Sequence, residues 1–169
     1  MLDQKFEVSE ELLASKGKRF LNHLLDLIPQ YAVVYGLAYL FFYFGEFTGN
    51  YSLNNYWNNT STIEDYLYSY LIMIGYYFLI ETTTSRSIGK YVTNTMVVTT
   101  DGERPSSLTV FKRSLCRMIP FDALSFLGTK GKGWHDSISN TYVVDVKKFE
   151  EKKLAVTSIA EIGKLPEDI

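Results

Sequence analysis

Residues 19–47 read RFLNHLLDLIPQYAVVYGLAYLFFYFGEF, and after Arg19 the only formal charges in this stretch are Asp26 and Glu46. About 20 predominantly apolar residues are enough for a helix to cross a hydrocarbon core of about 30 Å. Helices of soluble proteins rarely stay apolar on every side for so long, because one face meets water. The stretch therefore predicts a membrane-spanning helix over about 19–45.

A second apolar run follows from Tyr66 to Ile80. It is shorter than the first, but Glu81 and the three threonines after it can extend the helix to the membrane interface. We therefore expect a second spanning helix over about 65–85. The connecting segment 46–64 is rich in Asn, Ser, Thr and Tyr, which predicts a polar loop on one side of the membrane.

The basic residues around the two apolar runs are distributed unevenly. They lie before the first run and after the second, at Lys16, Lys18, Arg19, Arg86 and Lys90. The loop 46–64 contains no Lys or Arg. Because cytoplasmic flanks of membrane helices carry the excess of Lys and Arg, we predict a multi-pass protein of the cell (inner) membrane. Both of its termini are expected in the cytoplasm and the loop outside.

Composition sets further bounds on the class of protein. The chain has 169 residues and a net charge of -2, which gives no electrostatic case for nucleic-acid binding. One Cys and two His supply neither a disulfide framework nor a zinc site, so no metal or cofactor is expected. Residues 1–15 are a polar lead without the pattern of a cleaved signal peptide. The expected division is this lead, a membrane domain over 16–146 and a charged tail over 147–169.

The segment 86–146 is expected to form a cytoplasmic module. Strand-like runs at Thr95–Thr100 and Thr141–Val146 are candidates for a two-stranded sheet, and Asp101-Gly102 is a strong turn signal. Between the strands, a helix is predicted after Pro105. One face of that helix is apolar, with Leu108, Phe111, Leu115 and Met118.

Basic residues lie off the apolar face of this predicted helix. They are expected to contact lipid headgroups from a basic amphipathic helix in the interface of the inner leaflet, and they are Lys112, Arg113 and Arg117. Two alternatives stay open for residues 108–127: a soluble helix packed on the cytoplasmic module, and a re-entrant or third spanning segment. The predicted fold class is thus an all-α membrane protein with two transmembrane helices, this interfacial or re-entrant helix and a small two-stranded cytoplasmic sheet.

A polar stripe runs along the first helix. At helical spacing it contains Arg19, Asn22, His23, Asp26 and Gln30. An ionisable group in a membrane helix is expensive and normally faces other protein or a wet cavity. The stripe is therefore either an ion or substrate site or a set of buried charge pairs that fix the fold.

Several short motifs occur in an order that resembles the RDD family. They are Arg19-Phe-Leu-Asn-His-Leu-Leu-Asp26, Ser87-Ile-Gly-Lys90, Val97-Val98 with Asp101-Gly102, Arg113-Ser-Leu-Cys-Arg117, Ile119-Pro-Phe-Asp122, Trp134-His-Asp136 and Thr141-Tyr-Val-Val144. The resemblance covers about residues 18–144. It implies an integral membrane protein, with transport suggested for the class and no enzymatic activity. In this comparison Asp136 takes the place of the second aspartate of the family.

The resemblance and the polar stripe together define the expected site. Its candidate residues are Arg19, His23, Asp26, Gln30, Asp122 and Asp136. If Asp136 folds back toward Arg19, the two form an ion pair, and exchanging them should rescue each single variant.

Two functions are carried forward. The favoured one is an accessory or assembly subunit of a membrane complex. The alternative is an oligomeric transporter, or an ion- or proton-coupled carrier, that uses Arg19, Asp26 and Asp136. Because two helices cannot enclose a pathway, both functions require a homo-oligomer or a larger membrane partner in the bilayer.

Overall fold

The computed structural model describes residues 6–128 and 132–162. Its longest element is α1, Lys16–Thr48, which has 33 residues and is therefore about 50 Å long. The side chain of Ser15 caps the start of α1, and Gly49 ends it in the left-handed conformation with φ of 70°. Pro29 lies inside α1 without ending it. The first predicted helix is thus present and is longer at both ends than expected.

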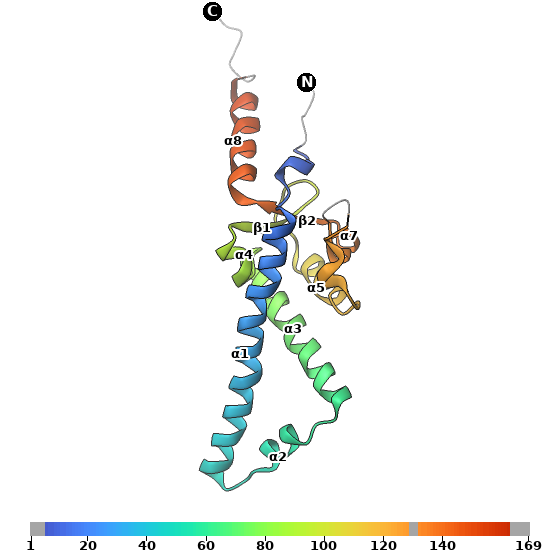
Figure 1. Cartoon of the computed structure of the whole chain (residues 1–169). Helices are drawn as coiled ribbons and strands as arrows, with labels where there is room; N and C mark the ends of the chain where they lie inside the picture. Colours follow the sequence, from blue (N-terminus) through green and yellow to red (C-terminus); the bar gives the residue numbers. More distant parts are fainter. Residues whose placement is uncertain (1–5, 129–131, 163–169) are drawn as a thin grey trace, which may run out of the picture.

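The second long helix is α3, Thr62–Thr84, which begins with a capping box between Ser61 and Glu64. α1 and α3 lie close at one end and diverge toward the other, where α2 (Ser52–Asn58) connects them (Figure 1). Part of the predicted polar loop is therefore helical. Trp57 of α2 packs against Phe41 of α1 at 5.5 Å and Tyr68 of α3 at 5.9 Å between ring centroids, so this aromatic contact bridges the open end of the helix pair.

A two-stranded antiparallel sheet lies beyond the convergent ends of α1 and α3. After the short helix α4 (Ile88–Val92), strand β1 (Thr95–Thr99) pairs with β2 (Thr141–Asp145). In register, Thr95 lies opposite Asp145 and Thr99 opposite Thr141. A small hydrophobic core covers the sheet and includes a residue of the 3-10 helix η1 (Glu10–Leu12), with the members Leu12, Val98, Val144 and Phe149. The predicted strand pairing is confirmed.

Three short helices complete the module beside the sheet. They are α5 (Ser107–Cys116), α6 (Asp122–Ser125) and α7 (Trp134–Ile138). The orientation of α5 is unusual, because it buries Arg113 and Ser114. Most of its apolar side chains are 39–63% exposed, at Leu108, Phe111 and Leu115, and so is Met118 just beyond its end, whereas Val110 is fully buried. The amphipathic helix is therefore present, but its polar face is the one that packs against the rest of the chain.

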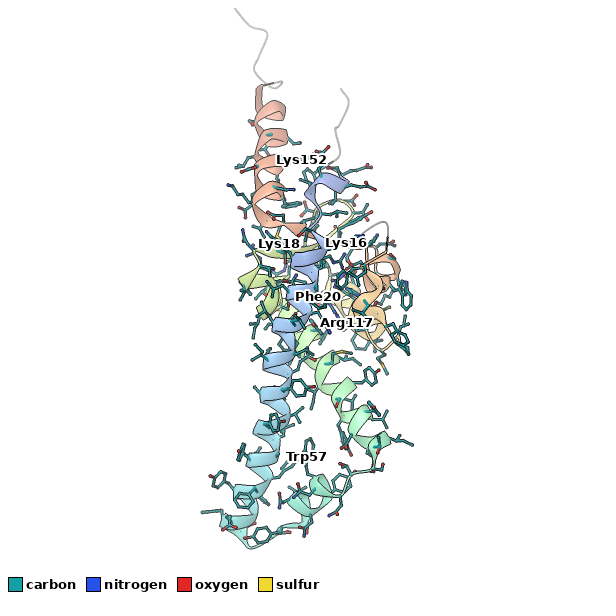
Figure 2. All side chains as sticks on the ribbon, in the orientation of Figure 1. Lys16, Lys18, Phe20, Trp57, Arg117 and Lys152 are labelled. Carbon is teal, nitrogen blue, oxygen red and sulfur yellow. The ribbon has the colours of Figure 1, made fainter. Side chains whose placement is uncertain are left out.

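The last element is α8, Val146–Ile162, a helix that begins directly after β2. It occupies most of the predicted charged tail; residues 163–169 of that tail and 1–5 of the predicted lead lie outside the described residues. Both ends of the described chain lie at the same end of the molecule, opposite α2 (Figure 1). Figure 2 shows Lys16, Lys18 and Lys152 toward that end and Trp57 at the other.

The chain is mostly helical with one small sheet, as predicted. Among the described helices, α1 alone is long and apolar enough by composition to cross a membrane. α3 has 23 residues, a length of about 34 Å, and its Tyr and Thr residues lower its mean hydropathy. A second crossing by α3 therefore stays a prediction.

Candidate functional site: a buried charge network

Ionisable side chains from six helices meet where α1 and α3 converge. We call this set the buried charge network. Its residues come from α1, α3, α4, the end of α5 and the α6–α7 segment, and are Arg19, Asp26, Glu81, Lys90, Arg113, Arg117, Asp122, His135 and Asp136. All but Arg117 are buried, and 11% of the Arg117 side chain is exposed. Such groups are rarely buried unless they are paired.

Asp136 joins α7 to two arginines. One carboxylate oxygen accepts from Arg19 Nη2 and from the main-chain N of Gly133 at 3.0 Å, and the other accepts from Arg113 Nη1. Burial alone would raise the pKa of this carboxyl, but the cationic groups around it, chiefly Arg113, hold its pKa well below the usual range. Asp136 is thus a fixed anion, and the predicted ion pair with Arg19 is present.

Glu81 is the second anion of the network and is fully buried near the end of α3. Its carboxylate oxygens lie 2.8 Å from Lys90 Nζ, 3.1 Å from Arg113 Nε and 3.5 Å from Arg117 Nη2. Arg113 therefore bridges Glu81 and Asp136. Glu81 is not among the residues that the sequence predicts for the site, although a carboxylate at the end of an apolar run is a signal for a buried partner.

Asp26 is held differently, by three neutral donors. Its carboxylate accepts from the Tyr76 hydroxyl at 2.8 Å, the Ser87 hydroxyl at 2.6 Å and the main-chain N of Gly89 at 2.7 Å. The bonds from Ser87 and Gly89 dock α4 against α1, and the bond from Tyr76 ties α3 to α1. They satisfy the carboxylate within the chain, which explains how Asp26, at 1% exposure, is tolerated in an otherwise apolar helix.

The segment Ser87-Ile-Gly-Lys90 is explained by the same contact. Ser87 caps α4 and bonds Asp26, and Lys90 reaches Glu81. At Gly89 a Cβ atom would fall within contact distance of main-chain atoms of Asn22, so glycine is required for the close approach of α4 to α1. The Asn22 amide in turn shares hydrogen bonds with the hydroxyls of Thr93 and Thr95.

Asp122 and His135 form a third unit of the network. The Asp122 carboxylate accepts from the main-chain N of His135 at 2.9 Å, and its other oxygen lies 2.5 Å from His135 Nδ1. Phe121, with φ of 66°, makes the sharp turn that presents Asp122. Burial lowers the pKa of His135 to about 4, so the imidazole is neutral at pH 7 and its Nδ1–H donates to Asp122.

The structure places the remaining predicted residues apart from these bonds. His23 is half-buried on the same side of α1, and the side chain of Gln30 donates to the main-chain O of Asp26 at 2.9 Å. Lys112 is exposed, as a lipid-contacting residue must be. The prediction of lipid contact is wrong for Arg113, which is fully buried. It stays a prediction for Arg117, which lies 3.7 Å from the Tyr77 ring centroid and keeps 11% of its side chain exposed. Helical spacing defines two faces but does not say which one packs inward.

A small cavity lies inside the network. Its volume is about 30 Å³, which is large enough to hold a water molecule. Figure 2 shows Arg117 near this junction of α1, α3 and α5. The lining residues come from the network and its neighbours: Arg19, Asn22, His23, Asp26, Tyr77, Lys90, Arg113, Arg117, Phe126, His135 and Val143.

Comparison with known proteins identifies one family. No curated protein and no solved structure matches the chain. The profile of the RDD family matches residues 13–140, which is more than half of the chain and includes every residue of the buried charge network. The chain therefore belongs to the RDD family, whose domains are found in membrane proteins.

Proposed function

We propose that this chain is a two-span membrane protein that serves as an accessory or assembly subunit of a membrane complex. The observation that carries the proposal is that the buried polar groups and the exposed apolar surfaces of the structure have separate roles. Donors of the same chain form hydrogen bonds with the buried carboxylates of Asp26, Glu81, Asp122 and Asp136. The apolar side chains along α1 and α3, in contrast, remain exposed. The polar groups thus fix the fold, and the open sides are available for other membrane helices.

Exposed apolar side chains support the membrane placement. Large hydrophobic residues are exposed along both long helices, for example Ile28 at 66% and Leu71 at 63%. The apolar side of α5 faces outward at the level of the buried charge network, and Phe121 beside it is 78% exposed. Patches of this kind mark contact with lipid or with a partner. In this arrangement α1 and α3 span the bilayer, and the α5–α7 segment lies in its inner interface.

A tyrosine row on α1 supports assembly with another membrane protein. Tyrosines recur at every fourth position, so they lie along one side of the helix, and they are 57–65% exposed at Tyr31, Tyr35, Tyr39 and Tyr43. A phenolic hydroxyl without a hydrogen-bond partner is unfavourable in hydrocarbon. Helices of a partner with polar side chains would satisfy these hydroxyls, whereas lipid tails would not.

Transport is the second candidate function. It is favoured by the cavity, because Arg19, Asp26 and His135 line a space large enough for a water-sized species. Against it stands the engagement of Asp26 by three donors from Tyr76, Ser87 and Gly89, which leaves this carboxylate little freedom to exchange an ion. We therefore place the assembly role first.

The proposed topology is tested by cysteine labelling in cells. In a Cys116→Ser background, Asn58→Cys lies in α2 and Lys152→Cys in α8, at opposite ends of the molecule. A membrane-impermeant thiol reagent should label Asn58→Cys in intact cells and Lys152→Cys only after permeabilisation. Labelling of both positions, or of neither, in intact cells would contradict the two-span arrangement.

The assembly role is tested on the protein extracted in mild detergent. The wild type should purify with a stoichiometric membrane partner, or as a defined oligomer, and should give no ion flux in liposomes. The variant carrying Tyr35→Phe, Tyr39→Phe and Tyr43→Phe should lose the association while keeping its helical content, because only three hydroxyls are removed. Tyr91→Phe, on the exposed side of α4, is the matched control. A flux that Asp26→Asn abolishes would instead favour transport.

A further inference from the structure

The lining of the small cavity carries an excess of positive charge. Four of its described lining residues are cations, Arg19, Lys90, Arg113 and Arg117, and Asp26 is the one carboxylate among them. The carboxylates of Glu81 and Asp136 form ion pairs with these cations but are not among the lining residues. A species in the cavity therefore meets guanidinium and ammonium groups before it meets the anions that balance them.

Two buried donor groups, which belong to the lining residues Arg113 and Arg117, have no partner among the described residues. Arg113 uses Nε for Glu81 and Nη1 for Asp136 and Thr141, while its Nη2 is buried and unpaired. The buried Nε of Arg117 is likewise unpaired. A fully buried arginine that leaves N–H groups unsatisfied carries a penalty, and both arginines line the same cavity. Such donors are suited to an acceptor that sits between them.

We propose that this cavity binds a small monovalent anion of about the size of chloride. The volume of about 30 Å³ is sufficient for a small ion, since about 10–15 Å³ of such space already holds one water molecule, and we expect the larger oxyanions sulfate and phosphate to bind more weakly. The cationic lining disfavours a metal cation. Water is the competing occupant, since it also accepts hydrogen bonds, but water does not gain from the positive charge of the lining in the way that an anion does.

The position of the cavity allows the anion to exchange. His23 is half-buried, and Arg117 keeps 11% of its side chain exposed, so this side of the cavity lies close to the molecular surface. Arg117 is also the least constrained of the four cations. Its partner Glu81 retains Lys90 and Arg113 when Arg117 is removed, so a variant at this position should keep the fold.

The test measures the thermal stability of the full-length protein in detergent at constant ionic strength. Chloride or bromide should raise Tm saturably by about 5 °C relative to gluconate and sulfate. Arg117→Gln should abolish this rise, and Lys112→Gln, an exposed basic position on the same helix, should preserve it. Bromide should also give an anomalous scattering peak between Arg113 and Arg117 in crystals.

A second variant removes the space without removing a charge. Val143 of β2 lines the cavity and is 3% exposed, so Val143→Ile adds one methyl group there. It should keep the fold and lose the chloride effect. Equal Tm values in all the sodium salts would overturn the proposal and leave water as the occupant. A non-saturating order with sulfate as the most stabilising anion, or a chloride effect that survives in both Arg117→Gln and Val143→Ile, would also overturn it.

Discussion

Asp136 and Arg19 lie 117 residues apart in the sequence and form a buried ion pair that ties α7 to the first turns of α1. The pair is not symmetrical. Asp136 also accepts hydrogen bonds from Arg113 and from the main chain of Gly133, so its carboxylate is shared between two arginines. This sharing changes the expected outcome of the charge exchange, because an arginine at position 136 would face Arg113.

The first prediction concerns this asymmetry. Asp136→Asn should destabilise the protein by about 3–5 kcal/mol, because Arg19 and Arg113 both lose a buried anionic partner and Arg113 keeps only Glu81. Arg19→Gln should cost less, about 1–3 kcal/mol, since Asp136 keeps Arg113 and Gly133. The double exchange of Arg19 and Asp136 should not restore stability. Unfolding in detergent measures all three, with Lys18→Gln as a control at a partly exposed pair expected to change stability by under about 1 kcal/mol. Full rescue by the exchange would contradict the shared role of Asp136.

The sequence predicted the parts of this site that local patterns encode. Arg19 and Asp26 stand out because charges are rare in a long apolar stretch, and the strand pair around Val97 and Val143 follows from β-branched runs that flank turn signals. The family motifs singled out Asp136, but its contact with Arg19 was only a hypothesis, because nothing in the local sequence around Asp136 shows how far back the chain folds.

The sequence did not predict the direction of α5 or the centrality of Glu81. Periodicity shows that Arg113 lies opposite Phe111, but it gives no sign of which face packs on α3. In water the apolar face would pack inward. Here the buried carboxylates of Glu81 and Asp136 draw Arg113 inward, and the apolar face turns outward. That inversion depends on anions contributed by two distant segments.

Glu81 gives the second prediction. Glu81→Gln should destabilise the protein by about 3–5 kcal/mol, because Lys90, Arg113 and Arg117 would keep their charges without the anion that they share. Asp65→Asn, an exposed acidic position at the other end of α3, is the control and should cost under about 1 kcal/mol. Chemical unfolding followed by circular dichroism measures both. Similar values for the two variants would show that Glu81 does not hold the network together.

The third prediction concerns the contact between α4 and α1. Gly89→Ala places a Cβ atom against main-chain atoms of Asn22, and backbone cannot rotate away as a side chain can. We expect a loss of about 1–3 kcal/mol in stability and lower yield of folded protein. Gly75→Ala is a matched control in α3, where an added Cβ meets nothing within 4 Å, and it should be neutral or stabilising by up to about 1 kcal/mol. Unchanged Tm in Gly89→Ala would refute the close approach of α4.

The fourth prediction is a pH dependence from His135. Burial lowers the pKa of this imidazole to about 4, while the same group in the unfolded chain titrates near 6.5. Between these values the unfolded state binds the extra proton, so stability should fall as pH decreases from about 6.5 to 4, by up to about 3 kcal/mol. His135→Asn can still donate to Asp122 but does not titrate, so it should flatten the profile in this window. His23→Gln, at the half-buried histidine of α1, should leave most of the profile in place. A profile equally steep in His135→Asn and wild type would assign the acid sensitivity to other groups, because only the His135 imidazole is removed in that variant.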